Sequence, residues 1–218
     1  RQEKGRYITL NYEQLAWEAG TYTHKLVPGK YRVLCSNRMP NGSLWVTQHY
    51  LQIQADEVKH LEIMLESGNI QDMLKNITIP NFFLSDGDQT YEAADIIPDE
   101  KAVVIWLEEG REPTEHVLNE LQAKEKEYRE SNVPIIFILK NQQALENATL
   151  EKTLEVLPQI KVYYLYDESD VEDIARRIFV EPNKYPLTMV TENGLNVVYG
   201  FSGYNVGLSS LIMKILNR

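Results

Sequence analysis

Three apolar runs, each followed by a helical pattern, limit the possible folds of this chain more than any other feature. The runs are AVVIWLE (102–108), VPIIFILK (133–140) and IKVYYLYD (160–167). Continuous apolar runs of this length are typical of strands that are buried on both faces. The segments after them have apolar residues at helical spacing: Val117, Leu118, Leu121 and Tyr128, then Leu150, Leu154 and Leu157, then Val171, Ile174, Ala175 and Ile178. Strands that alternate with helices predict a parallel sheet covered by helices.

Hairpins are predicted on both sides of this alternating region. NFFLSDGDQTY (81–91) predicts a hairpin around Asp86-Gly87, and YPLTMVTENGLNVVYGF (185–201) predicts two strands joined by an Asn193-Gly194 turn. A last helix is predicted in LSSLIMKIL (208–216). This order of elements resembles the thioredoxin fold with a peroxiredoxin-type N-terminal extension. Thioredoxin-like domains keep a cis-proline directly before the first strand of the final hairpin, so the resemblance predicts a cis bond before Pro186.

The first third of the chain has the composition of β-structure. Short runs rich in β-branched and aromatic residues are RYITLNY (6–12), TYTHKLV (21–27), KYRVLCSN (30–37), SLWVTQHYLQIQ (43–54) and VKHLEIMLE (58–66). Pro40-Asn41-Gly42 predicts a hairpin turn between the third and fourth runs. We therefore expect a small antiparallel β-sandwich of the immunoglobulin or fibronectin kind over residues 1–68. A linker over 69–79 and a thioredoxin-like domain over 80–218 would follow.

The charge of the chain argues against some classes of partner. The formal net charge is −10, and residues 71–218 contain fourteen Lys and Arg against twenty-five Asp and Glu. Such a field repels phosphate, so we expect neither nucleic-acid binding nor docking on an anionic membrane. No apolar run approaches the ~20 residues that span a bilayer, so no membrane insertion is expected. The first residue is Arg1, which favours an excerpt or a processed product, and the compartment stays open between cell envelope and cytoplasm.

Cysteine and histidine usage argues against metal and thiol chemistry. Cys35 is the one cysteine, which excludes an internal disulfide and a thiolate metal cluster. It lies in a predicted strand, where we expect a buried thiol rather than a nucleophile. His24, His49, His60 and His116 form none of the usual metal-binding spacings. We therefore expect no metal and no cofactor.

The turn EEGREP (108–113) lies where a thioredoxin-like domain carries its CxxC motif, between the first core strand and its helix. The positive end of that helix lowers the pKa of the first thiol in the family. This turn has no cysteine, and thiol–disulfide exchange and peroxide reduction both need a sulfur nucleophile. The redox chemistry of the fold is therefore excluded here. The simplest interpretation is a helix start, with Pro113 in the first turn and Glu112 and Glu115 at the positive helix end.

Three functional interpretations of the sequence remain beside that structural one. In the first, a groove that binds a peptide or a partner loop is rimmed by Glu108, Glu109, Arg111, Glu112, Thr114, His116, Tyr185 and Pro186. Its acidic charge would favour basic segments. In the second, Glu108, Glu112 and His116 perform general acid–base chemistry in a hydrolase or in a composite site shared with another domain. In the third, the sandwich binds carbohydrate or cell wall through Trp17, Trp45 or Tyr50.

Three segments together carry a resemblance to a family. PGKYRVLCSNRMPNGSLW (28–45), REPTEHVLNELQA (111–123) and SGYNVGLSSLIMKIL (202–216) are similar to the C-terminal region of large bacterial transglutaminase-like proteins. The resemblance covers nearly the whole chain in the same order. It implies an upstream transglutaminase-like domain, a papain-like Cys/His/Asp enzyme, as a partner within the same protein. No position here matches those catalytic residues, so the resemblance implies a non-catalytic accessory region that positions the enzyme or recognises protein or peptide partners.

Overall fold

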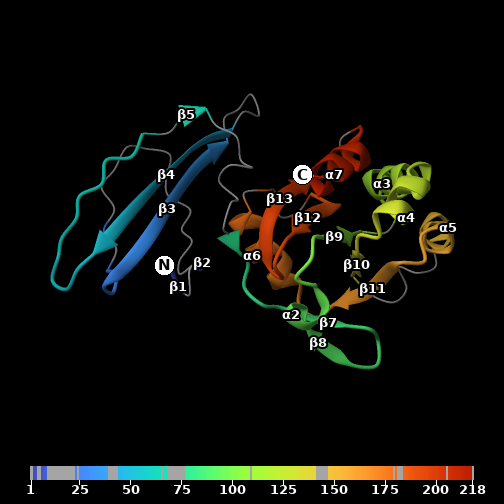
Figure 1. The fold of residues 1–218 in the computed structure, drawn as a ribbon, viewed down its shortest axis with the longest axis horizontal. Helices are drawn as coiled ribbons and strands as arrows, with labels where there is room; N and C mark the ends of the chain where they lie inside the picture. Colours follow the sequence, from blue (N-terminus) through green and yellow to red (C-terminus); the bar gives the residue numbers. More distant parts are fainter. Residues whose placement is uncertain are drawn as a thin grey trace. The chain divides into compact units, whose positions relative to one another are not determined.

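The computed structural model describes residues 2–3, 6–8, 23, 25–38, 44–64, 66–67, 77–108, 110–140, 147–178, 180, 184–204 and 206–217. The chain divides into two compact units, Arg1–Thr78 and Ile79–Arg218 (Figure 1). Within the described ranges, no helix has both the length and the apolar character needed to cross a bilayer.

The first unit is built around one long hairpin. Strands β3 (Gly29–Arg38) and β4 (Leu44–Ile53) are antiparallel over their full length, and β5 (Glu66–Ser67) pairs with β4. The predicted hairpin is therefore confirmed, although its turn residues 40–42 lie outside the described residues. Two short strands, β1 (Gln2–Glu3) and β2 (Arg6–Ile8), are antiparallel, and β2 runs parallel to β6 (Ile77–Thr78).

Two strands predicted for this unit are wrong where the structure describes them. Residues 58–64 form no strand, and of the described residues of that run only Glu66 pairs with a neighbouring strand. Residues 23 and 25–27 form no strand either. The reason is that apolar composition without strict alternation is a weak strand signal. Val58 and Met64, which contributed to it, are 81% and 72% exposed. The β-sandwich as a whole stays a prediction.

The second unit has a mixed sheet in the order β13-β12-β9-β10-β11-β7-β8. Its parallel centre consists of β9 (Ala102–Leu107), β10 (Ile135–Leu139) and β11 (Ile160–Leu165). Strand β12 (Leu187–Thr191) is antiparallel to β9, and β13 (Asn196–Ser202) is antiparallel to β12. At the other side, β7 (Phe83–Ser85) is antiparallel to β11 and forms a hairpin with β8 (Thr90–Glu92). Every residue of β9 and β10 is buried, as the apolar runs predicted.

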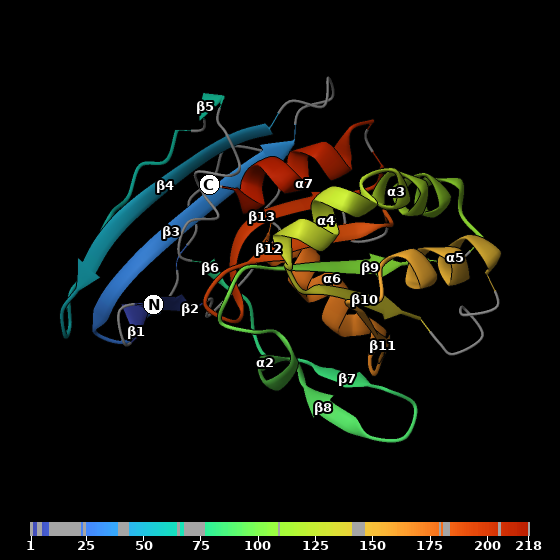
Figure 2. The same cartoon turned by 45° about the vertical axis from the view of Figure 1, so that its right-hand side comes forward.

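Helices cover both faces of this sheet. Helices α3 (Glu112–Ala123), α4 (Glu125–Ser131), α5 (Ala148–Val156) and α7 (Leu208–Leu216) share one buried cluster with alternate residues of the central strands, including Leu118, Phe137 and Ile212. Helix α6 (Glu168–Arg177) lies on the opposite face in both views (Figures 1 and 2). The short α2 (Ala93–Ile96) follows β8. The predicted apolar stripes are therefore the buried faces of these helices.

The arrangement is a thioredoxin-like fold. A parallel pair, β9 and β10, is joined through helices, an antiparallel pair, β12 and β13, follows it in the sheet, and α7 closes the domain. The additional β11–α6 unit is inserted between β10 and β12. The Tyr185–Pro186 peptide bond is cis and directly precedes β12, as the resemblance predicted.

Candidate functional site

The turn after β9 has the hydrogen bonds of a helix start. The Thr114 hydroxyl donates to the backbone carbonyl of Glu108 at 2.8 Å, and the carbonyl of Arg111 accepts from the backbone amides of Thr114 and Glu115. Gly110 has a φ of +69°, a left-handed conformation that glycine adopts without steric cost. Pro113 lies in the first turn of α3, where its missing amide hydrogen is not needed. These contacts agree with the interpretation of EEGREP as a helix start, although the N-cap residue Arg111 makes no side-chain cap hydrogen bond.

The acidic residues of this turn have separate partners. The Glu108 carboxylate pairs with Arg111 Nε at 3.3 Å, whereas Glu112 pairs with His116 Nε2 at 3.3 Å. The Glu112 side chain is 86% exposed, so its pair adds little stability. Among the residues that the structure describes, no hydrogen bond joins Glu108 to the Glu112–His116 pair. Glu109, also predicted for the groove, lies outside the described residues.

The other side of His116 contacts the loop before α7. Its ring stacks on Tyr204 with the centroids 4.8 Å apart. The Tyr204 hydroxyl donates to Glu120 at 3.0 Å, and the same carboxylate accepts from the backbone amides of Gly207 at 2.7 Å and Ser209 at 2.9 Å. Glu120 therefore fixes the β13–α7 loop to α3. Sequence reasoning missed Glu120, because nothing in its local pattern distinguishes it from a solvated glutamate.

The loop that contains the cis-proline, residues 184–186, is hydrogen-bonded to the same β13–α7 loop. The backbone amide of Gly203 donates to the carbonyls of Lys184 and Pro186, each at 2.9 Å. Gly203 has a φ of +78°, and a Cβ there would come within 2.8 Å of the Lys184 side chain. Tyr185 is half-buried and Pro186 is buried. The two loops that flank the start of α3 are therefore held to each other by backbone hydrogen bonds.

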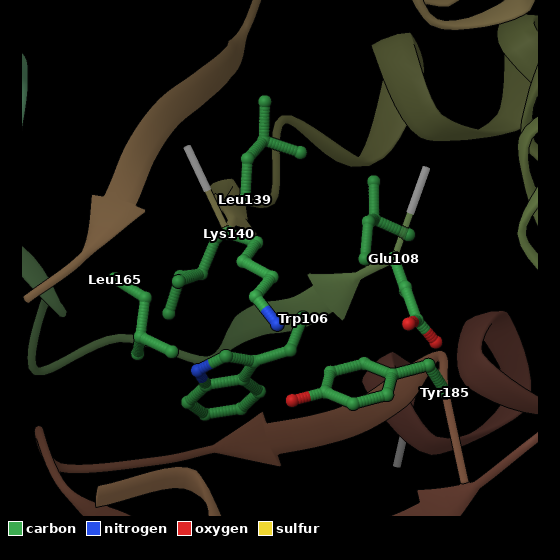
Figure 3. A pocket seen from close by; sticks show the side chains of 8 residues that line it. Trp106, Glu108, Leu139, Lys140, Leu165 and Tyr185 are labelled. Carbon is green, nitrogen blue, oxygen red and sulfur yellow. The ribbon is translucent and has the colours of Figure 1, made fainter. Parts of the chain in front are cut away.

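A small pocket lies at the carboxyl ends of the three parallel strands (Figure 3). Ligands of open α/β sheets bind at this edge. Its walls are Trp106, Leu107 and Glu108 from β9 and the residue after it, Ile138, Leu139 and Lys140 from β10 and the residue after it, Leu165 from β11, and Tyr185. Its volume of about 30 Å³ has room for roughly two water molecules. The pocket can therefore hold the tip of a larger ligand.

The pocket includes only some of the residues predicted for the groove. Glu108 and Tyr185 line it, whereas Arg111, Glu112 and His116 do not. Thr114 is buried beneath the turn and Pro186 is buried beside Tyr185. Sequence reasoning missed Trp106, Lys140 and Leu165. The last residues of successive buried strands meet at one edge of a parallel sheet, and that signal would have found them.

Trp106 is the least satisfied polar side chain of the pocket wall. It is 1% exposed, and its Nε1 has no hydrogen-bond partner in the described part of the chain. A buried donor left without an acceptor costs about 1–3 kcal/mol. The ring packs against Phe82 with the centroids 5.8 Å apart. Lys140 and Glu108, of opposite charge, stand on different sides of the hollow (Figure 3).

The remaining candidates from the sequence lie in the first unit. Cys35 is half-buried in β3, and burial raises its pKa, which favours the less reactive thiol. Trp45 and Tyr50 are 39% and 59% exposed on β4, and their odd spacing puts them on opposite faces of the strand. Trp17 lies outside the described residues. Within the described ranges, no three His, Cys, Asp or Glu side chains are grouped to hold a metal ion.

Comparison of the sequence with protein-family models and with curated proteins finds no match. Solved structures with a similar fold include peroxiredoxin 5 from Alvinella pompejana, with 12% identity over 62% of this chain and 94% of the other and a TM-score of 0.47. A thio-disulfide isomerase from Thermus thermophilus has 19% identity over 64% and 93%, with a TM-score of 0.44. The thioredoxin domain of a thiol-disulfide oxidoreductase from Bacteroides vulgatus has 12% identity over 66% and 98%, with a TM-score of 0.44.

Proposed function

We propose that this chain is a non-catalytic accessory region of a transglutaminase-like protein and that its thioredoxin-like domain binds a peptide segment at the pocket beside Tyr185. The observation that carries the proposal is the pocket itself. It lies at the sheet edge where ligands bind in this class of fold, and its small volume suits one side chain of a polymer. The backbone hydrogen bonds between the cis-proline loop and Gly203 keep the surrounding surface rigid, which reduces the entropy lost on binding.

The chemistry of the turn supports binding over catalysis. A thioredoxin-like enzyme needs a thiolate at the start of α3, and the turn there offers carboxylates, a guanidinium and an imidazole. A hydrolase that uses Glu108, Glu112 and His116 would need these side chains to converge on one substrate atom. Glu108 pairs with Arg111 and faces the pocket, while Glu112 and His116 pair with each other along α3. This separation favours a recognition surface.

Charge narrows the class of partner. Residues 79–218 contain thirteen Lys and Arg against twenty-four Asp and Glu, a formal charge of −11. A field of this sign slows the approach of acidic segments and attracts basic ones. We therefore expect the bound peptide to carry no net negative charge. Within the parent protein, a loop of the upstream transglutaminase-like domain is a candidate for this peptide.

The test is selection of peptides from a random phage-displayed library on the immobilised chain, followed by affinity measurements on variants. We expect the selected peptides to lose about tenfold or more in affinity for Tyr185→Ala, since aromatic residues at the centre of an interface dominate binding. Tyr166→Ala is the matched control, because Tyr166 is 66% exposed and does not line the pocket. A library that yields no binder, or binders equally weakened by both substitutions, would contradict the proposal.

A further inference from the structure

The wall of the pocket contains a hydrogen-bond donor that the described part of the chain does not satisfy. Trp106 Nε1 is buried and unpartnered, and Figure 3 shows it on the edge of the ring beside Leu165, another wall residue. An indole N–H donates and never accepts. An acceptor brought by a bound molecule would therefore remove a penalty that the free domain carries.

The surroundings of this donor narrow the kind of acceptor. Most of the wall is apolar, with Leu107, Ile138, Leu139 and Leu165 facing the hollow. Glu108 and Lys140 have opposite formal charges, so the wall as a whole adds no net charge. The net charge of −11 on residues 79–218 disfavours a carboxylate ligand. An acceptor that matches these walls is therefore neutral.

The size of the pocket determines which neutral acceptor can enter. A volume of about 30 Å³ admits the tip of a side chain and leaves the backbone of the ligand outside. A backbone carbonyl is flush with its own chain and does not reach into such a recess. A carboxamide ends a short apolar stem with one carbonyl acceptor and two N–H donors. Its carbonyl oxygen can accept from Trp106 Nε1.

We propose that the pocket selects an asparagine or glutamine side chain of the bound peptide, with Trp106 Nε1 donating to the carboxamide oxygen. This inference rests on the proposed function, because it requires that a peptide binds at the pocket. It adds the identity of the anchoring side chain and the atom that recognises it. Leucine would leave the indole donor unsatisfied, and glutamate would be opposed by the charge of the domain.

The experiment follows the indole resonances of the ¹⁵N-labelled full chain during titration with capped peptides Ac-Ala-Ala-X-Ala-Ala-NH₂, where X is Gln, Asn, Leu or Glu. The chain has three tryptophans, and comparison with Trp17→Phe and Trp45→Phe assigns the Trp106 resonance. We expect the Gln or Asn peptide to move the Trp106 indole proton downfield and to bind about tenfold more tightly than the Leu peptide. The resonances of Trp17 and Trp45 should stay in place.

The other outcomes separate this inference from the proposed function. Equal affinity for the Leu peptide, or a preference for the Glu peptide, would overturn carboxamide selection and leave peptide binding intact. In a further outcome, the peptides bind elsewhere on the domain and none of them shifts the Trp106 indole resonance. This result would show that water alone is the partner of Trp106 Nε1, and it would overturn carboxamide selection. Absence of binding by all four peptides, together with an empty phage selection, would overturn both proposals.

Discussion

Replacement of Glu120 by alanine tests how the last helix of the domain is held. Helix α7 begins after Gly207, which has a φ of +84° and no side chain to cap the helix. Two backbone amides at the start of α7, those of Gly207 and Ser209, donate to the Glu120 carboxylate of α3, which also accepts from the Tyr204 hydroxyl. Glu120→Ala removes all three hydrogen bonds and the negative charge at the positive end of the helix.

The expected loss follows from these contacts. Loss of a helix cap costs about 0.5–2 kcal/mol, and a hydrogen bond to a charged group contributes about 1.5–3 kcal/mol when it is buried. Because Glu120 is half-buried and water can replace part of each bond, we expect a total loss of about 2–4 kcal/mol. For a domain of this size the melting temperature should fall by roughly 6–12 °C.

Thermal and urea denaturation followed by circular dichroism would measure the effect. Glu120→Gln keeps one acceptor oxygen and should lose about half as much stability. Glu130→Ala is the matched control, since its side chain is 67% exposed and its Lys126 contact is 3.8 Å long, and it should change the free energy of unfolding by less than about 0.5 kcal/mol. If Glu120→Ala were no more destabilising than Glu130→Ala, the capping role of Glu120 would be refuted.

Two further variants test contacts outside the pocket. Lys101 Nζ donates to the carbonyls of Ile215 and Leu216 at the end of α7, at 3.3 and 3.4 Å, so Lys101→Met should lower the free energy of unfolding by about 0.5–1 kcal/mol. An unchanged urea midpoint would contradict this role. Burial, followed by the charge of Asp167, raises the pKa of Asp170. A raised carboxyl pKa in the folded state means that the ionised form destabilises the fold at neutral pH, and that this penalty vanishes below the unfolded value of 3.8. Asp170→Asn should therefore raise stability in urea at neutral pH and leave it unchanged below pH 3.8, and a gain of the same size at both pH values would contradict the linkage.

Local pattern was sufficient for most elements of the second unit. The apolar runs 102–108 and 133–140 predicted its two fully buried parallel strands, because residues buried on both faces must all be apolar. The run 160–167 correctly predicted the third parallel strand but not its burial, since Ile160 is the one buried residue of β11 and Lys161 is exposed. The Asn193-Gly194 pair predicted the turn of the last hairpin, and Asn193 and Gly194 both have positive φ values there. The same reasoning failed for residues 58–64, whose apolar side chains are exposed where the pattern suggested a strand. Composition alone does not say which core, if any, a segment faces.

The candidate site was only partly visible in the sequence, since its residues are far apart along the chain. The turn at 108–113 and the Tyr185–Pro186 pair were predicted, because a fold resemblance assigns them a place. Trp106, Lys140 and Leu165 form one wall with them only because three parallel strands end at the same edge of the sheet. Whether Trp106 Nε1 has a hydrogen-bond partner likewise depends on tertiary packing, which no local sequence pattern shows.

Helix α7 shows most clearly which features the local sequence determined and which depended on the tertiary structure. The run LSSLIMKIL by itself determined that a helix forms at 208–216, because helix formation depends on the pattern of neighbouring residues. Tertiary structure alone decided how its two ends are satisfied: a carboxylate from α3 accepts the free amides at its start, and the ammonium of Lys101 binds the free carbonyls at its end. Hydrogen-bonding groups at helix ends need partners from outside the helix, and folding determines which distant residues supply them.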